Sequence, residues 1–493
     1  MTFSELRECA QRAGSFLRSR SCVRVSLIDI NSPAVPLALF GAAAAGAVYA
    51  PINYRLPDDR LVRLVERIAP AVVIVGEGIA DRIGPPPPGI VLVPRAEFLE
   101  ACRSGGPGAP PAEPGPEDTA ALIFTSGTSG DPKAAVLRHQ NLTSYVISTV
   151  DFMSASENDC ALVSVPAYHI AGISAVLSCT YSGRRMVQLP QFDAKEWVAL
   201  ARHESVTHAM IVPTMLELIL DILAETPGPC LPALQTLSYG GGPMPLPVIE
   251  RAMRLLPHVG FVNAYGLTET SSTIAILTPE DHRSARDSQD DAVRARLASV
   301  GRPLPSVDVS IRDEQGNPVP TGERGEIWVR GGQVGGEYAG QPSARRSGDW
   351  FQTRDEGHLD AARYLFVHGR LDDVIVRGGE NLSPGEIEAV LRSHPAVHDA
   401  AVVGLPDTRW GEQVAAVIVL DDTATASSEE LRDHVRARLR STMTPALIRF
   451  REALPYSDTG KLLRRVVRAD LLDPVMRPEA TARDRATLAQ LSE

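Results

Sequence analysis

The feature that most constrains the fold of this 493-residue sequence is a series of short apolar runs, each ending in small or polar residues. The runs alternate with segments of helical periodicity, and this alternation is typical of parallel α/β folds whose strands end at ligand loops. The central runs are Ala121–Ser126, Ala161–Pro166, Ala209–Pro213, Leu234–Gly240 and Val259–Gly266. The sequence therefore predicts an α/β protein.

The chain is too long for a single hydrophobic core, because cores stop growing near ~250–300 residues. The pattern changes near Leu371. There a short strand precedes a helix with Ser383 as the predicted N-cap, Pro384 as the first-turn proline and Glu386 as the capping-box acid. We therefore expect a large N-terminal domain over residues 1–370 and a smaller C-terminal domain over residues 371–493.

Local patterns predict further elements in the N-terminal domain. Residues 2–18 have helical spacing, with Thr2 and Glu5 placed for a capping box. The stretch Pro36–Ile52 indicates a buried helix that runs into a strand rather than a membrane span. Residues 84–117 are rich in Pro and Gly and indicate a loop, residues 282–296 indicate an exposed polar stretch, and residues 307–331 indicate two antiparallel strands.

Composition and charge exclude several classes of protein. A hydrophobic content of 44% is ordinary for a globular chain, and the net charge of −11 comes without the basic domain that nucleic-acid binders carry. The six cysteines form no CxxC pair, and the histidines have no metal-ligand pattern. The first residues lack the pattern of a signal peptide. We expect reduced thiols, no nucleic-acid partner, no transmembrane segment and a cytoplasmic location.

The sharpest chemical signal is TSGTSGDPK at Thr125–Lys133, directly after a predicted strand. Glycines let backbone N–H groups turn inward, hydroxyls add hydrogen-bond donors and the lysine adds positive charge, so such a loop can cradle a triphosphate. The string is not a Walker motif, because no Lys-Ser/Thr pair follows the second glycine at the required spacing.

This string resembles the phosphate-loop signature of the adenylate-forming superfamily, which includes acyl- and aryl-CoA synthetases, peptide-synthetase adenylation domains and luciferases. Further motifs follow in that family's order and spacing, and the resemblance extends to about residue 472. These motifs are NAYGLTET (263–270), SGDWFQTRDEG (347–357), GRLDDVIVRGGENLSPGEIE (369–388) and SDTGKLLRR (457–465).

The resemblance implies a fold and a reaction. The family has an N-terminal domain of stacked α/β sheets with a small β-barrel, and a mobile C-terminal domain of the α+β type. In the family's chemistry a carboxylate attacks the α-phosphate of Mg-ATP, giving an acyl adenylate and pyrophosphate. A thiol, usually that of coenzyme A, then displaces AMP after the C-terminal domain rotates. We therefore expect an AMP-forming acid–thiol ligase that uses ATP, Mg²⁺, CoA and a small-molecule carboxylic acid.

The family's motifs, matched residue by residue, imply the nucleotide site. Thr268 is implied to contact phosphate, and Glu269 to hold Mg²⁺, a cation that prefers carboxylate and phosphate oxygens. Tyr265 resembles the residue that stacks on adenine, and Lys461 the lysine that bridges the substrate carboxylate and the α-phosphate. The residues implied to bind ATP or AMP are Thr125, Ser126, Gly127, Thr128, Ser129, Gly130, Lys133, Gly240, Gly241, Gly242, Tyr265, Gly266, Asp355 and Arg370.

The remaining matches concern the ribose, acyl and thiol sites. Asp355 matches the acid that binds the ribose hydroxyls, and Asp372 matches the hinge. His169 matches the histidine that CoA-forming members place after an aromatic residue near the acyl pocket. Gly378 and Gly379 match the loop that lines the pantetheine tunnel, where residues without a Cβ are needed. The catalytic candidates are therefore Lys461, Glu269, Thr268 and His169.

The sequence departs from the family's pattern at a few places without losing a catalytic group. Arg354 stands where a glycine usually precedes the ribose acid, and Ala134 replaces a glycine after the phosphate loop. The stretch GGEYAGQPSARRSGDW is shorter than the family's substrate-side loop. We expect Arg354 to add a cation close to the nucleotide and to alter the local turn.

Two alternatives stay open. The acyl acceptor is either CoA or the phosphopantetheine of a carrier protein, and the chain is either an enzyme or a non-catalytic nucleotide-binding relative. The presence of Lys461 and Glu269 argues against the non-catalytic alternative. The region after His169 lacks the aspartate that holds an amino group in peptide-synthetase domains, which favours a simple carboxylic acid. The patterns specify neither the acid nor the oligomeric state, and the residues considered for the acid pocket are Tyr168, His169, Met215, Tyr239 and Met244.

Overall fold

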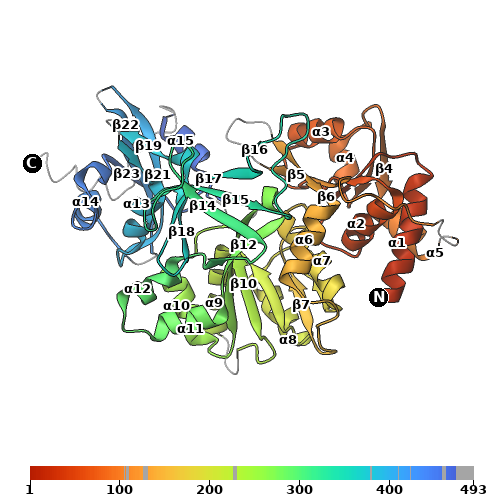
Figure 1. The fold of residues 1–493 in the computed structure, drawn as a ribbon, viewed down its shortest axis with the longest axis horizontal. Coiled ribbons are helices and arrows are strands. Elements are labelled where there is room, and N and C mark those ends of the chain that lie inside the picture. The colour runs from red at the N-terminus through yellow and green to blue at the C-terminus, as the bar shows by residue number, and fades with distance from the viewer. Residues whose placement is uncertain are drawn as a thin grey trace, which may run out of the picture. The chain divides into compact units, whose positions relative to one another are not determined.

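The computed structural model describes residues 1–104, 106, 110–125, 132–225, 230–377, 380–408, 410–421, 424–457 and 462–472. The chain divides into two compact units (Figure 1). The N-terminal unit comprises Met1–Thr353 and Gly357–Val367, and the C-terminal unit comprises Arg354–Glu356 and the residues from His368 onward.

The first sheet of the N-terminal unit has the strand order β4-β3-β1-β2-β5-β6. Its strands are parallel except for the antiparallel pair β5–β6. Helices α1 and α2 share a hydrophobic core with one face of this sheet, and α3 and α4 share a core with the other. The bounds are β1 Arg24–Ile28, β2 Val48–Tyr49, β3 Ala71–Val75, β4 Ile90–Pro94, β5 Thr119–Thr125, β6 Lys133–Arg138, α1 Phe3–Arg18, α2 Ala34–Ala45, α3 Asp58–Arg67, α4 Ile79–Ile83, α5 Arg95–Ser104 and α6 His139–Thr149.

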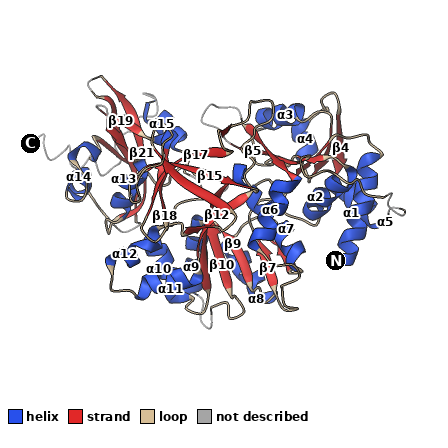
Figure 2. Cartoon of the chain, viewed as in Figure 1, coloured by secondary structure: helices blue, strands red, loops and turns tan. Residues whose placement is uncertain are grey.

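The second sheet has the strand order β13-β12-β11-β10-β9-β7-β8, and helices alternate with its parallel strands along the chain (Figure 2). Strands β7 to β11 are parallel, while β12 and β13 pair antiparallel. The bounds are β7 Cys160–Val163, β8 Arg185–Gln188, β9 His208–Ile211, β10 Thr236–Gly240, β11 Gly260–Leu267, β12 Ser272–Leu277, β13 Arg302–Pro303, α7 Ile170–Ser182, α8 Ala194–His203, α9 Pro213–Glu225, α10 Leu246–Leu255, α11 Pro279–Asp287 and α12 Asp291–Arg294.

The cores of the two sheets meet at α7. Ile173 and Val176 of this helix belong to the same buried cluster as Ala13 and Leu17 of α1, and α7 also contacts β7 and β8. The five apolar runs that predicted an α/β protein are all strands: β5, β7, β9, β10 and β11. This part of the prediction is confirmed, because apolar runs that short fit buried strands between helices.

A small antiparallel sheet completes the N-terminal region, at the place where the resemblance predicts a barrel. It has the order β14-β15-β17-β16, with β18 paired to β17. The predicted antiparallel pair over residues 307–331 is confirmed as β14–β15. The bounds are β14 Val307–Arg312, β15 Gly325–Gly331, β16 Arg345–Arg346, β17 Trp350–Leu359 and β18 Leu365–Arg370.

The C-terminal unit contains a mostly antiparallel sheet of order β20-β19-β22-β21, with β23 parallel to β22. Helices α13 and α14 pack on one face, while Val467 of α15 joins the cluster on the other. The bounds are β19 Ile375–Arg377, β20 Glu380–Leu382, β21 Val397–Asp407, β22 Gly411–Leu420, β23 Leu447–Phe450, α13 Pro384–Arg392, α14 Ser428–Arg436 and α15 Arg464–Leu472.

Two predictions are wrong here, one of a loop and one of a capping box. Residues 84–117 are not all loop, because β4 and α5 lie among them; Phe98 and Cys102 of α5 are fully buried, and the Phe98 ring centroid lies 6.0 Å from that of Phe16 in α1. Pro and Gly gather at the two ends of the segment, so its composition hid an apolar centre. Ser383 is the N-cap of α13, but its hydroxyl donates to the carbonyl of His368 at 2.9 Å, and the predicted capping box does not form.

Two further local predictions are confirmed, the capping box of α1 and the stretch that runs from helix to strand. The Thr2 and Glu5 side chains form the capping box of α1. The stretch Pro36–Ile52 contains most of α2, which is largely buried, followed by β2. Among the described residues, no helix has the length and apolar character needed to cross a membrane. The six cysteines are free thiols, four of them buried.

Candidate active site

The two ends of the predicted phosphate loop are neighbours on the first sheet. Strand β5 ends at Thr125 and β6 begins at Lys133, and the two residues pair across the antiparallel ladder. Thr125 Oγ1 donates to the carbonyl of Lys133 at 3.4 Å. The ladder therefore fixes the spacing of these two described ends. The loop residues Ser126, Gly127, Thr128, Ser129 and Gly130 lie outside the described residues.

Glycines at the ends of β10 and β11 are required by the close approach of neighbouring backbone. A Cβ on Gly240 would lie 2.2 Å from the carbonyl oxygen of Ala264, and one on Gly266 would lie 1.8 Å from that of Ser272. Gly241 has a φ of +82°, in the left-handed region that favours glycine. Close packing accounts for Gly240 and Gly266, and the left-handed backbone accounts for Gly241. The contact of Gly240, Gly241, Gly242 and Gly266 with adenine or AMP stays a prediction.

Tyr265 and the acidic turn follow at the end of β11. The Tyr265 side chain is half-buried against the core of the small antiparallel sheet, the third sheet, which contains β14 and β15. It lies beside a register shift between Tyr265 and Gly266 in the pairing of β11 with β12. Thr268 and Glu269 lie in a 3₁₀ turn, Thr268–Thr270, and both are half-buried. The backbone carbonyl of Glu269 accepts a hydrogen bond from the N–H of Gly335 at 2.8 Å. The turn is therefore held in place from the side of the third sheet.

Lys133 and Glu269 meet at one tyrosine. The hydroxyl of Tyr338 donates to Glu269 Oε1 at 2.6 Å. The Nζ of Lys133 lies 5.3 Å from the centroid of the Tyr338 ring, within the range of a cation–π contact. The structure thus places the predicted phosphate cation and the predicted metal carboxylate around Tyr338, which the sequence analysis did not identify. In the sequence, the only indication of a role for Tyr338 was its place in the shortened stretch GGEYAGQPSARRSGDW.

His169 is the N-cap residue of α7, and its side chain is half-buried. Its ring centroid lies 4.5 Å from that of Tyr168, and the Tyr168 ring packs edge-on against Tyr54 at 6.0 Å. The predicted aromatic–histidine pair therefore forms. Its role at an acyl pocket stays a prediction.

Tyr239 does not fit the acid pocket for which it was considered. It is fully buried in the core of the second sheet, and its hydroxyl lies 2.8 Å from His282 Nε2. The other ring nitrogen of His282, Nδ1, lies 2.8 Å from the Thr278 carbonyl. The prediction of an exposed stretch is wrong at His282, because this residue turns inward from α11; burial lowers its pKa. Met215 is likewise a core residue, whereas Met244 is half-buried at its edge.

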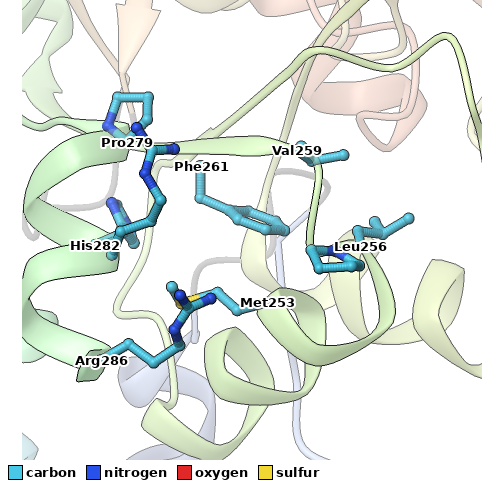
Figure 3. Close-up of a pocket in the computed structure, with 9 residues that line it drawn as sticks. Met253, Leu256, Val259, Phe261, Pro279, His282 and Arg286 are labelled. Atoms are coloured by element: carbon cyan, nitrogen blue, oxygen red, sulfur yellow. The ribbon is translucent and has the colours of Figure 1, made fainter.

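His282 also lines a shallow hollow between α10 and α11, with Met253, Phe261, Pro279 and Arg286 around it (Figure 3). The hollow holds about 210 Å³ of open space. None of the predicted catalytic or nucleotide-binding residues lines it. It is therefore not the candidate active site.

The C-terminal unit carries the predicted ribose site. The Asp355 carboxylate is buried, with 7% of its side chain exposed, and Arg370 Nη1 donates to its Oδ1 at 3.0 Å. The two residues lie on the paired strands β17 and β18. The pairing fixes the orientation of the carboxylate, which is what the recognition of two vicinal hydroxyls requires.

Arg354 explains why a glycine is usual before the ribose acid. Its φ of +61° lies in the left-handed region, where a residue with a Cβ is strained. Its guanidinium Nη2 donates to Asp372 Oδ1 at 2.9 Å. Arg354 therefore keeps the glycine-like turn, contrary to the expectation of an altered one, and pairs with the residue predicted as the hinge.

Besides the phosphate-loop residues, three more predicted residues lie outside the described residues: Gly378, Gly379 and Lys461. The chain on either side of them is well anchored. Arg377 and Glu380 pair across β19 and β20, and Tyr456 forms an antiparallel bridge with Leu462. The roles of the three residues stay predictions.

The described residues contain no group of three or more His, Cys, Asp or Glu side chains able to hold a metal ion. This fits the way Mg²⁺ binds in nucleotide sites, through one or two carboxylates plus substrate phosphates. Glu269 is a half-buried carboxylate that shares the contact residue Tyr338 with the Lys133 cation. The donor set therefore suits a metal shared with a triphosphate rather than one enclosed by protein.

Comparison with known families decides the identity. The profile of the family described as AMP-binding enzyme matches residues 1–339, and that of the AMP-binding enzyme C-terminal domain matches residues 386–461. The chain belongs to the AMP-binding enzyme family. Its motifs and its relatives place this AMP-binding enzyme on the acyl-CoA synthetase branch of the adenylate-forming superfamily, as the resemblance predicted.

Individual relatives match this AMP-binding enzyme almost end to end. The long-chain-fatty-acid–CoA ligase FadD13 of Mycobacterium tuberculosis is 32% identical over 483 residues, covering 95% of this chain and 92% of the relative. The feruloyl-CoA synthase of an Amycolatopsis species is 33% identical over 480 residues, covering 95% and 93%. The fatty acid–[acyl-carrier-protein] ligase ScoC of Streptomyces coeruleorubidus is 29% identical, covering 95% and 91%.

The fold agrees with solved structures. The o-succinylbenzoate CoA synthetase of Bacillus subtilis, solved with its acyl-adenylate intermediate, superposes with a TM-score of 0.81 at 28% identity, covering 96% of this chain and 93% of that one. The same synthetase has also been solved with ATP and a magnesium ion. The predicted fold class, a large N-terminal domain with a smaller C-terminal domain, is confirmed. Membership of this branch makes the chain an AMP-forming acid–thiol ligase that uses ATP and CoA as substrates together with Mg²⁺.

Proposed function

We propose that this enzyme activates a small-molecule carboxylic acid as an acyl adenylate and then transfers the acyl group to the thiol of coenzyme A. The observation that carries the proposal is the meeting of Lys133 and Glu269 around Tyr338. A cation and a carboxylate that share one contact residue suit a magnesium–triphosphate complex, since one side chain can face phosphate charge and the other the metal.

In the first step a carboxylate oxygen of the acid attacks the α-phosphorus of ATP, and the bond to pyrophosphate breaks. Lys133 and the preceding loop hold the β- and γ-phosphates, and Thr268 contacts phosphate. Glu269 is the protein ligand of Mg²⁺, which neutralises phosphate charge when bound. Lys461 stabilises the charge that develops on the α-phosphate and aligns the acid.

Several further residues hold the AMP part. Asp355 accepts hydrogen bonds from the two ribose hydroxyls, and Arg370 orients that carboxylate through the 3.0 Å hydrogen bond between them. Tyr265 stacks on adenine beside the Gly240–Gly242 turn. These assignments are supported by the ion pair of the buried Asp355 with Arg370 and by the position of Tyr265 at the end of β11.

In the second step the thiol attacks the acyl carbon and AMP leaves. We assign the domain boundary near residue 370, the hinge to Asp372 and the thiol tunnel to Gly378 and Gly379. Rotation about the hinge withdraws Lys461 and brings in the glycine loop. A hinge needs few residues that absorb a change in φ and ψ, and Asp372 lies in a short 3₁₀ turn between β18 and β19.

The acid is a simple carboxylic acid rather than an amino acid. Helix α7, which follows His169, begins with IAGISAV and offers no carboxylate to an amino group. CoA is the proposed acceptor, and carrier-protein phosphopantetheine is the second candidate, supported by the similarity to ScoC. The free thiols favour a cytoplasmic location.

The test is ATP–pyrophosphate exchange with a panel of fatty, aryl and amino acids, followed by thioester formation with CoA or with a loaded carrier protein. Exchange that depends on a carboxylic acid, followed by a CoA thioester, is the expected result. Exchange only with amino acids would overturn the substrate class, and acylation of the carrier protein alone would overturn the acceptor. Binding of ATP without exchange for any acid would identify a non-catalytic relative.

A further inference from the structure

Residues Gly335–Ala339, which we name the strap, connect the Glu269 turn to β6. The N–H groups of Gly335 and Gly336 donate to the Glu269 carbonyl at 2.8 and 3.3 Å. Farther along, Val136 donates to the carbonyl of Glu337, and Ala339 donates to that of Ala134, both at 2.9 Å. One short segment therefore hydrogen-bonds to the metal-site turn and to the strand that begins with Lys133.

The strap is held rigidly on its other side. Arg345 donates from Nε to the Gly335 carbonyl at 2.9 Å and from Nη2 to the Val334 carbonyl at 2.6 Å. The Arg138 guanidinium pairs with Glu337 at 2.7 Å, and each of these two side chains is only 28% exposed. The position of Tyr338 is thus determined by backbone and charge contacts that do not involve its own ring.

Held by these contacts, Tyr338 in turn contacts both Glu269 and Lys133. Its hydroxyl donates to Glu269 Oε1 at 2.6 Å, a distance typical of a charge-assisted hydrogen bond. Its ring lies 5.3 Å from the Lys133 ammonium. A hydrogen bond to one carboxylate oxygen restricts the rotation of the Glu269 side chain and leaves the other oxygen, Oε2, for a metal ion.

We propose that Tyr338 is a positioning residue that presents Glu269 to Mg²⁺ and holds Lys133 beside the same phosphates. The proposal rests on the proposed function of Glu269 and Lys133 and extends it to a residue that touches neither metal nor phosphate. Tyr338 acts before the substrate binds, because its contacts exist in the protein alone. Its effect is therefore on metal affinity and on the adenylation step, not on thioester formation.

The variant Tyr338→Phe keeps the ring beneath Lys133 and removes only the hydroxyl. A matched control is Tyr364→Phe, because the Tyr364 hydroxyl also donates to a carboxylate, Asp281 Oδ1, at 2.6 Å and has Arg296 over its ring at 4.4 Å. Both variants lose the same kind of hydrogen bond, but only Tyr338 contacts the candidate metal site. If loss of the hydrogen bond acts only by disturbing the fold, Mn²⁺ binding would change in both variants.

The measurement is Mn²⁺ binding by electron paramagnetic resonance in the presence of a non-hydrolysable ATP analogue, with thermal unfolding alongside. Tyr338→Phe is expected to weaken Mn²⁺ binding about tenfold, the effect of losing one charge-assisted hydrogen bond. Tyr364→Phe is expected to leave Mn²⁺ binding unchanged. Given a preformed acyl adenylate and CoA, Tyr338→Phe is expected to make thioester at the wild-type rate.

A double-mutant cycle with Glu269→Gln separates the inference from the proposed function. If Tyr338 acts through Glu269, the Phe substitution has no further effect on Mn²⁺ binding once Glu269 is Gln. A Glu269→Gln variant that binds Mn²⁺ normally would overturn the metal role itself. Weakened binding in Glu269→Gln together with unchanged binding in Tyr338→Phe would overturn only the positioning role, as would equal losses in the Tyr338 and Tyr364 variants.

Discussion

Arg354 Nη2 donates a hydrogen bond to Asp372 Oδ1 at 2.9 Å, so the residue that departs from the family's glycine pairs with the residue proposed as the hinge. Both belong to the C-terminal unit. The Arg354 side chain is 51% exposed and that of Asp372 is 28% exposed. Arg354 also has a φ of +61°. Its ion pair stabilises the turn while its backbone conformation destabilises it.

Arg354→Gly is predicted to change stability little, because the two effects oppose each other. Relief of the left-handed strain gains ~1 kcal/mol, whereas an exposed ion pair contributes roughly 0.2–1 kcal/mol. We expect a shift in melting temperature of less than about 4 °C and a change in the KM for ATP of less than about tenfold. Complete loss of adenylation would show that Arg354 contacts the nucleotide, contrary to this assignment.

Arg464 is predicted to stabilise the C-terminal unit. Its Nε and Nη2 donate to the buried Glu388 carboxylate at 3.0 and 2.7 Å, and its Nη1 donates to Asp373 at 3.0 Å. In Arg464→Leu the buried Glu388 carboxylate would lose its two short contacts with Arg464 and keep the longer one from Arg392 at 3.4 Å. We therefore expect a loss of about 3 kcal/mol, the lower end of the range for a broken buried pair. Urea unfolding measures the loss. The exposed neighbour Arg465→Leu is the control, expected within about 0.5 kcal/mol of the wild type; equal effects of the two substitutions would refute the role of the buried pair.

His208 is predicted to make stability depend on pH. Burial, with a smaller effect of nearby Arg184, lowers its pKa from 6.5 to about 4. The folded protein holds this ring neutral, whereas the unfolded chain protonates it below pH 6.5. Stability is therefore present above that pH and is lost as the pH falls toward 4.

Replacement of His208 with Gln tests this prediction. Urea unfolding at several pH values should show a smaller loss of free energy between pH 6.5 and about 4 in His208→Gln than in the wild type. The same slope in both proteins would show that His208 is accessible to protons in the folded state.

Local sequence patterns predicted secondary structure well where the pattern lay within the element itself. The strands β5, β7, β9, β10 and β11 were predicted because each is a short apolar run between helices. Helix α5 was missed because Pro and Gly on both sides dominated the composition of its segment. The inward turn of His282 was missed because the surrounding residues are polar, while its hydrogen-bond partner Tyr239 lies 43 positions away.

The candidate site was likewise predicted only in part. Motif matching placed Lys133 and Glu269 in one function, but no pattern indicated that they meet at Tyr338, which is 69 positions from Glu269. Ser383 was predicted as the N-cap from its spacing, but its hydroxyl bonds to His368, a partner that only the folded chain provides. Spacing predicts local hydrogen bonds, whereas contacts between distant strands and turns depend on the tertiary fold.

Gly379→Leu is predicted to impair only the second half-reaction. A leucine side chain in the proposed tunnel would obstruct the pantetheine arm, so thioester formation should slow while ATP–pyrophosphate exchange stays at the wild-type level. A parallel fall in both reactions would exclude Gly379 from the tunnel. Gly379→Leu and Lys461→Ala are therefore expected to impair opposite half-reactions.

The most direct test of the proposed two-step reaction, with its proposed mobile C-terminal domain, is to measure both half-reactions in Lys461→Ala. In the proposed role the lysine is needed only while pyrophosphate leaves, so exchange should fall by ~10²–10³, the loss typical of one preorganised charge contact in a transition state. Given a synthetic acyl adenylate and CoA, the variant should form thioester at close to the wild-type rate. Equal losses in both half-reactions with a normal melting curve, or exchange at the wild-type rate, would contradict the proposed role of Lys461.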